Sequence, residues 1–236
     1  VGSFTSSAHL NLTASKDGLN TVGDININGG SLTVNADVDG VYSRNGIINI
    51  NCNSIINAKE RAIRARRGTI TITGDLTAKS TASGIACIEA GAWSNNRAYW
   101  GHITINGGTV DVSSAGDGIY ANFGDFNLSG KGKISSSNGI AVYCISLKDT
   151  DWDGGNAMIT GDFVLSGKEY GINAINYLTL TSGSIQSTGS LYSYQGNISL
   201  TGNIDVTASA KERAIRARRG TIVITGDLTA KSTAPG

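Results

Sequence analysis

Apolar residues alternate with polar ones over short stretches of this chain, and turns rich in glycine and asparagine separate the stretches. Residues 102–105, 109–112 and 117–121 show the pattern well. Alternation with period two is typical of a strand that is buried on one face. The pattern therefore predicts three short strands here, with these inward residues: Ile103, Ile105, Val110, Val112, Ile119 and Ala121.

The same three-strand unit recurs along the chain at intervals of 19 to 33 residues. The units open at Gly23, Gly46, Gly68, Gly101, Gly124, Ala157, Tyr177, Gly196 and Gly220. One unit cannot bury its apolar face alone, so successive units must stack about 4.8 Å apart and share a core. Parallel crossover connections are right-handed by strong preference. We therefore expect an all-β, single-stranded right-handed parallel β-helix, a solenoid of about nine coils with three short strands each, continuous over residues 1–236.

Residues 58–67 have a composition that favours a helix instead. The repeat argues against it, because Arg61 to Ala65 aligns with residues 39–43 and 117–121 of other coils. We expect a third strand here. Residues 58–84 recur at 210–236 with two differences, Thr71 against Val223 and Ser83 against Pro235. The chain starts without a methionine and stops inside a repeat, so we expect it to be a fragment of a longer protein.

Composition narrows the function classes. Charged residues make up 16% of the chain and the net charge is +1, which gives no global field for nucleic acid or an anionic membrane. No apolar run approaches the roughly 20 residues of a membrane span, so we expect no membrane insertion. Cys52, Cys87 and Cys144 fall at different positions of the repeat, which indicates small core or turn residues and no disulfide framework.

Two segments, residues 89–100 and 146–156, lengthen their coils at the same corner, between a third strand and the next first strand. The intervening coil separates their anchors, so we expect the two loops on one edge, roughly 10 Å apart. They hold all three tryptophans, and exposed aromatic rings beside amides and charges suit the stacking and hydrogen bonding of sugars. The alternative is that these rings cap an apolar edge of the coil. The candidate carbohydrate-binding residues are Trp93, Asn95, Arg97, Tyr99, Trp100 and Trp152.

The second of these segments contains the sequence D-T-D-W-D-G at residues 149–154. Carboxylates at alternate positions before a glycine turn can converge on a calcium ion. Thr160 stands where an EF-hand has its bidentate glutamate, which excludes an EF-hand proper. The candidate metal ligands are Asp149, Asp151 and Asp153, and the alternative is a solvated acidic turn.

The outward positions of the third strands form another candidate surface. We expect this row to be Asn20, Tyr42, Arg64, Ala86, Tyr120, Ala141, Asn173, Tyr192 and Arg216. Tyr42 would lie one coil below Arg64, and Tyr192 one coil below Arg216, within cation–π range. Such a strip suits carboxylated sugars, because guanidinium groups match carboxylates. The alternative is a solvated face that prevents aggregation.

Catalysis has little support in the sequence. A polysaccharide lyase on this fold needs a base facing a cation-binding set of carboxylates, whereas Asp17, Asp39 and Asp117 occupy turns of different coils. A hydrolase needs two carboxylates about 5 to 9.5 Å apart in one cleft. His9 and His102 have no nearby partner motif for a nucleophilic triad.

Residues 17–30 and 117–124 carry the coil motif A-x-x-D-G-I-x-A-x-G-x-I-x-I-x-G-G-x-I-x-V in recognisable form. In this the chain resembles the right-handed β-helical carbohydrate-binding domain family of clostridial and gut-bacterial surface proteins, whose fold is similar to that of pectate lyases. The resemblance covers nearly the whole chain and implies calcium-assisted, non-catalytic binding of cellulose-like or acidic plant polysaccharides. The chain departs from the motif where Arg61-Ala62 and Arg213-Ala214 replace the Asp-Gly pair.

The leading hypothesis is therefore an extracellular or cell-surface module that binds polysaccharide, with acidic polysaccharides among the candidate ligands and calcium as the one candidate cofactor. The chain also looks like autotransporter passenger domains. The first alternative is accordingly a structural adhesin or filament module that would self-associate end to end through exposed coil ends. The second alternative is a polysaccharide lyase.

Overall fold

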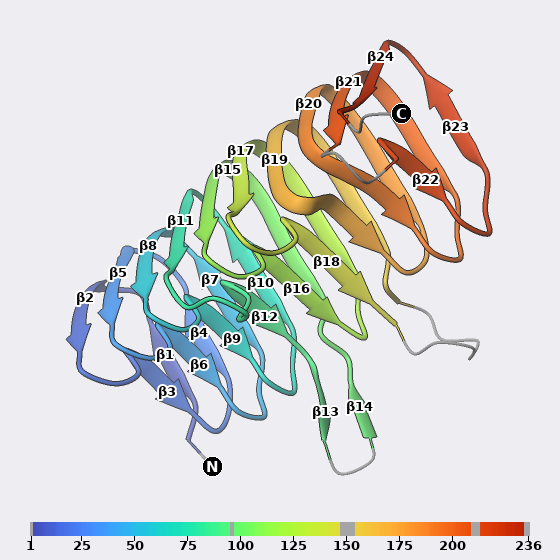
Figure 1. The fold of residues 1–236 in the computed structure, drawn as a ribbon. Coiled ribbons are helices and arrows are strands. Elements are labelled where there is room, and N and C mark those ends of the chain that lie inside the picture. The colour runs from blue at the N-terminus through green and yellow to red at the C-terminus, as the bar shows by residue number, and fades with distance from the viewer. Residues whose placement is uncertain (1, 95–96, 147–153, 209–212, 234–236) are drawn as a thin grey trace.

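The strands of this protein wind into a parallel β-helix of ten coils (Figure 1). The computed structural model describes residues 2–94, 97–146, 154–208 and 213–233. Within these ranges the chain contains strands, turns and bends and no helix, which confirms the predicted all-β solenoid. No helix in the described ranges is therefore long and apolar enough to span a bilayer.

Each of the first nine coils contributes a segment to a first, a second and a third parallel sheet, and the described part of the tenth coil contributes to the first and second. The first four coils contain β1 (Phe4–Ser6), β2 (His9–Ala14), β3 (Leu19–Thr21), β4 (Ile25–Ile27), β5 (Ser31–Ala36), β6 (Val41–Ser43), β7 (Ile48–Asn51), β8 (Asn53–Ala58), β9 (Ile63–Ala65), β10 (Ile70–Thr73), β11 (Leu76–Ser80) and β12 (Ile88–Ala90). The fifth to tenth coils contain β15 (Ile103–Ser114), β16 (Ile119–Asn122), β17 (Phe126–Ser136), β18 (Val142–Ile145), β19 (Ala157–Ala174), β20 (Leu178–Ser193), β21 (Ile198–Ala208), β22 (Ile215–Ala217), β23 (Ile222–Thr225) and β24 (Leu228–Ser232). Between β12 and β15 a separate antiparallel hairpin of β13 (Ala92–Ser94) and β14 (Arg97–Tyr99) projects from the coils (Figure 1).

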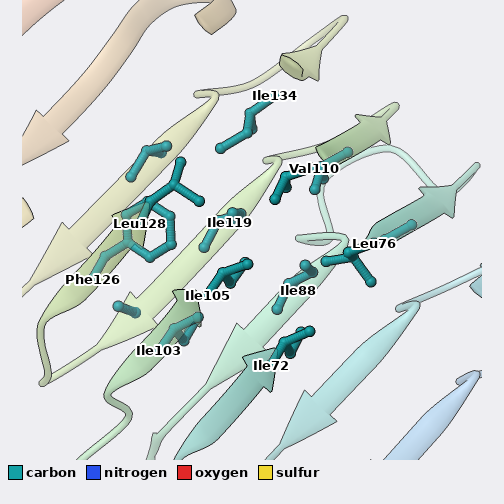
Figure 2. Packing of buried hydrophobic residues seen from close by; sticks show 14 of the residues in the cluster. Ile72, Leu76, Ile88, Ile103, Ile105, Val110, Ile119, Phe126, Leu128 and Ile134 are labelled. Atoms are coloured by element: carbon teal, nitrogen blue, oxygen red, sulfur yellow. The ribbon is translucent and has the colours of Figure 1, made fainter. Parts of the chain in front are cut away.

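The core is built from the inward residues of all three sheets, stacked coil upon coil. In the third sheet Ile63 pairs with Ile88, which pairs with Ile119, and all three are fully buried. Figure 2 shows how side chains of successive coils fill the interior. The six inward residues predicted for residues 103–121 are all buried, and so are the three cysteines. Residues 58–67 contain β9 and no helix, as the repeat predicted.

Aspartate and asparagine side chains at the corners connect many of the coils to the next. Their carboxylate or amide oxygens accept hydrogen bonds from backbone N–H groups one coil further on, where the chain turns and the sheet ladder is interrupted. The pairs are Asp17 with Asp39, Asp24 with Ile47, Asp39 with Arg61, Asn53 with Asp75, Asp117 with Ile140, Asp125 with Asn156 and Asn156 with Tyr177. Backbone donors at the corners gain hydrogen-bond partners in this way, so these polar residues serve the fold.

Candidate functional site

The outward side chains of the third sheet form one row that crosses nine coils. We call it the outer strip, and its members are Asn20, Tyr42, Arg64, Glu89, Tyr120, Tyr143, Asn173, Tyr192 and Arg216. Tyr42 lies below Arg64 with 5.3 Å between guanidinium carbon and ring centroid, and Tyr192 lies below Arg216 at 5.6 Å. Both predicted cation–π contacts are confirmed.

Two positions of the predicted row are wrong. Glu89 stands where Ala86 was expected, and Tyr143 stands where Ala141 was expected. The cause is the length of the second corner, which holds residues 81–87 in the fourth coil and 137–141 in the sixth, against 37–40 in the second. Both alanines are buried. The sequence signal that could have identified the outward residues is the apolar alternation Ile88-x-Ala90 and Val142-x-Cys144.

An ion network occupies the N-terminal half of the outer strip. The Asp39 carboxylate is buried and lies 3.8 Å from a guanidinium nitrogen of Arg61 and 3.7 Å from one of Arg64. Arg61 also donates a hydrogen bond through Nε to Glu89 in the next coil. Burial raises the pKa of Asp39 above its ordinary value, and the charges of Arg61 and Arg64 oppose that shift. Much of the positive charge of this half is thus neutralised within the protein.

Asp39 gives a prediction about stability and pH. Replacing it with Asn keeps an oxygen that can accept the hydrogen bond from Arg61 N, whereas Asp39→Ala leaves this donor without its partner, at a cost of about 1–3 kcal/mol. We expect Asp39→Asn to be the milder change in urea unfolding at pH 7. Burial raises the pKa of Asp39 in the folded protein above its ordinary value of 3.8. Its contribution to stability is therefore complete below pH 3.8 and is lost as pH rises through the folded pKa. Asp39→Asn should remove this pH dependence, and equal losses of unfolding free energy in the Asn and Ala variants would contradict the role of Asp39 as acceptor for Arg61 N.

Two tyrosines occupy the middle of the outer strip. The rings of Tyr120 and Tyr143 stack on each other at 5.1 Å with 17° between their planes. One face of each ring is therefore turned toward the other tyrosine, which favours ring edges and hydroxyl groups as the groups offered to a ligand. Burial raises the pKa of both tyrosines, and Tyr143, Glu89 and Asp117 add to the shift at Tyr120. Both hydroxyls therefore stay protonated at neutral pH and can donate as well as accept hydrogen bonds.

The first inserted segment forms the β13–β14 hairpin, which we call the tryptophan hairpin. Trp93 pairs with Ala98 across it and Ala92 pairs with Tyr99. Since directly paired residues share a face and neighbours alternate, Trp93 and Tyr99 lie on opposite faces. The structure therefore does not bring all the predicted hairpin residues into one cluster.

Contacts with the coils hold the aromatic side chains of this hairpin. Trp93 packs against Phe123 of the fifth coil, with 6.0 Å between ring centroids. Tyr99 lies under the guanidinium of Arg67 from the third coil, at 4.8 Å, and also contacts Arg97. Trp100 stacks nearly parallel on His102 at 6.0 Å. Trp93 and Trp100 nevertheless remain 53% and 41% exposed, so both indoles combine fixed positions with free surface.

Phe123 supports Trp93 from a strained backbone position. Its φ is +58°, and it is the one non-glycine residue with positive φ in the described part of the chain. Such a conformation costs roughly 1–3 kcal/mol and persists only where the surroundings enforce it. The buried Phe123 ring beneath an exposed indole is one such surrounding contact.

The second inserted segment starts from the same corner. Gly155 N donates to Gly124 O in the turn that follows β16, one coil above the base of the hairpin. The predicted site residues Asn95, Trp152, Asp149, Asp151 and Asp153 lie outside the described residues. Among the described residues, no group of three His, Cys, Asp or Glu side chains could hold a metal ion.

The strand pairings and the stacked corners define the class of the protein as a parallel β-helix with a row of aromatic and polar side chains along one sheet. Residues 4–139, more than half of the chain, match a family model described as carbohydrate-binding domain-containing protein. The chain therefore belongs to this family. Searches of the curated proteins and of the solved structures found no match.

Proposed function

We propose that this protein binds an extended polysaccharide without cleaving it, at the tryptophan hairpin and along the outer strip. The observation that carries the proposal is the pair of fixed but exposed indoles, Trp93 and Trp100, at the corner where the third sheet ends. An aromatic side chain that is already held in place loses little conformational entropy when a sugar ring stacks on it. Membership of a carbohydrate-binding family supports the same class of ligand.

The outer strip supplies the polar half of such a site. Its tyrosine hydroxyls, guanidinium groups and amides recur at about 4.8 Å per coil, so a chain of sugars lying along the solenoid would meet a new partner at every step. The half-buried side chain of Asn173 lies between Tyr143 and Tyr192 and adds an amide to this series.

The nearby carboxylates support binding over cleavage. Asp39 and Glu89 are engaged with guanidinium groups, and Asp117 accepts a hydrogen bond from the backbone of Ile140 at 2.8 Å. Side chains held in this way are poorly placed to act as general base or to collect a metal ion. The proposal also includes an extracellular or cell-surface location, because that is where an extended polysaccharide ligand would be met.

Calcium is a separate part of the proposal, and it rests on the sequence D-T-D-W-D-G alone. Alternate carboxylates before a glycine are oxygen ligands of the kind that calcium prefers. We expect glycan binding to be weaker in EDTA and restored by added calcium. Identical binding in EDTA would remove calcium from the proposal and leave the hairpin untouched.

The test is a glycan array followed by titration with the best soluble ligand. Trp93→Ala with Trp100→Ala should weaken binding about tenfold or more, since ring contacts contribute about 1 kcal/mol each. Tyr120→Phe with Tyr143→Phe removes two hydroxyls but keeps the stacked rings, and should weaken binding less. Ile55→Ala removes an exposed apolar side chain of the second sheet, away from the hairpin and the outer strip, and serves as the control.

Three results would overturn the proposal. The first is unchanged binding in the double tryptophan variant. The second is binding to no glycan together with end-to-end assembly, which would favour the structural adhesin or filament. The third is an absorbance rise from unsaturated product with polygalacturonate and calcium, which would favour a polysaccharide lyase.

A further inference from the structure

A groove follows the second corner of the coils, where the strands of the second sheet end. It consists of two adjoining cavities of about 730 Å³ and about 450 Å³. Lys79 and Thr81 line both cavities, so the two form one continuous depression. The groove residues differ from those of the outer strip and of the tryptophan hairpin.

One row of outward side chains in strict register runs the length of this groove. It consists of Thr13, Asn35, Asn57, Lys79, Ser113, Ser135 and Ser166. At about 4.8 Å per coil the row extends for roughly 29 Å. Hydroxyl and amide side chains both donate and accept hydrogen bonds, so this row repeats such a group at six of its seven steps.

The charges in the groove are few. Asp37 and Lys59 form an ion pair of 2.9 Å with each other. Lys79 lies midway along the row. Of the three charged residues that line the groove, it is the one without an ion pair in the described part of the chain. The groove thus offers one cation with polar uncharged side chains on either side of it.

We propose that this groove is a second glycan site, which takes a single extended chain and places a carboxylate-bearing sugar at Lys79. The inference rests on the proposed function for the class of ligand, but it concerns another face of the coils. A repeating polymer of hydroxyl groups matches a repeating row of hydroxyls and amides.

The lining argues against other extended polymers. The apolar residues of the lining are alanines, so the anchoring side chains of a peptide would have no pocket. A nucleic acid strand would present a row of phosphates to a single unpaired lysine, whereas its binding depends on many cations. A sparsely charged polysaccharide fits both the polarity and the charge.

The duplicated segment provides a matched control. Lys231 is the copy of Lys79 within identical local sequence, from Leu228 to Ser232 against Leu76 to Ser80, and it lines neither cavity. Both lysines are exposed, so replacing either with Ala should leave the coil intact. Ser113→Trp provides a second, steric variant, because Ser113 is exposed and lines the groove.

The probes are hexagalacturonate and its methyl ester, titrated calorimetrically into the full chain. We expect Lys79→Ala to weaken hexagalacturonate binding about tenfold and Lys231→Ala to leave it unchanged. The methyl ester carries no carboxylates, so it should bind equally well to the two lysine variants. Ser113→Trp should weaken both probes. Equal binding of hexagalacturonate by the wild type, Lys79→Ala and Ser113→Trp would overturn the groove site.

The same titrations separate this inference from the proposed function. Loss of binding in Trp93→Ala with Trp100→Ala, but not in the groove variants, would retain the hairpin and overturn the groove. The reverse pattern would retain the groove and overturn the hairpin. A wild type that does not bind hexagalacturonate overturns the groove proposal as stated, and the glycan array then decides on the hairpin.

Discussion

Replacing Ile159 with Asp is expected to unfold the protein or to remove most of its stability. Ile159 lies in β19, is fully buried, and pairs with Leu128 below and Leu180 above. A carboxylate at this point would be buried without a partner, and losses above about 4 kcal/mol arise from such changes. Total stabilities are only about 5–15 kcal/mol, so urea unfolding followed by circular dichroism should show a large shift of the midpoint.

The adjacent residue supplies the control. Met158 belongs to the same strand, points outward and is 50% exposed, so Met158→Asp should change the stability by about 0.5 kcal/mol or less. Because each coil contacts only its neighbours, the damage from Ile159→Asp should start in the middle of the stack. Similar unfolding midpoints for the two variants would contradict the assignment of inward and outward faces.

The fold could be predicted because one signal repeats in every coil. Period-two alternation fixes which side chains point inward, and the need of each coil to cover its neighbour fixes the stacking. Counting opening residues from Gly23 gave nine coils, whereas the residues before Gly23 form a coil of their own, β1 to β3, and bring the total to ten. The strong helix formers of residues 58–67 were overridden because Ile63 and Ala65 complete the core between neighbouring coils.

The predicted outer strip was wrong in the fourth and sixth coils, whereas Tyr120 and Asn173 were placed correctly even though they follow lengthened coils. Tyr42 and Arg64 are 22 residues apart and Tyr192 and Arg216 are 24 apart, and both pairs meet in space as expected. The longer second corners of the fourth and sixth coils shift the register, so Glu89 and Tyr143 were missed. A strand register depends on the number of corner residues that precede it, which alternation inside the strand does not reveal.

The placement of Trp93 and Tyr99 on opposite faces of the hairpin could not be predicted from the sequence, for a related reason. Placing Trp93 and Tyr99 in one segment says that they are near each other, but the antiparallel pairing decides which face each side chain takes. The groove escaped notice because Thr13, Asn35, Asn57 and Lys79 look like ordinary solvent-facing residues of four separate strands. Only their register brings them into one row.

Deleting the tryptophan hairpin is expected to weaken glycan binding about a hundredfold while the coils stay folded. Ala90 aligns with Ala121 and Ile103 aligns with Phe126, so the four-residue corner 122–125 can replace residues 91–102 without a change of register. The replacement removes Trp93 and Trp100, and two ring contacts of about 1 to 1.5 kcal/mol each account for an effect of this size. Titration with the ligand found on the array measures the affinity, and urea unfolding measures the stability.

The comparison that interprets this deletion is Trp93→Ala with Trp100→Ala, which keeps the hairpin backbone. If the indoles carry the binding, the double variant should show most of the loss seen in the deletion, and both proteins should unfold near the wild-type midpoint. Full affinity after the deletion would exclude the hairpin from the site. A deletion protein that binds nothing and also unfolds early would show instead that the contacts of Trp93 with Phe123 and of Tyr99 with Arg67 stabilise the coils, because those contacts join the hairpin to its neighbours.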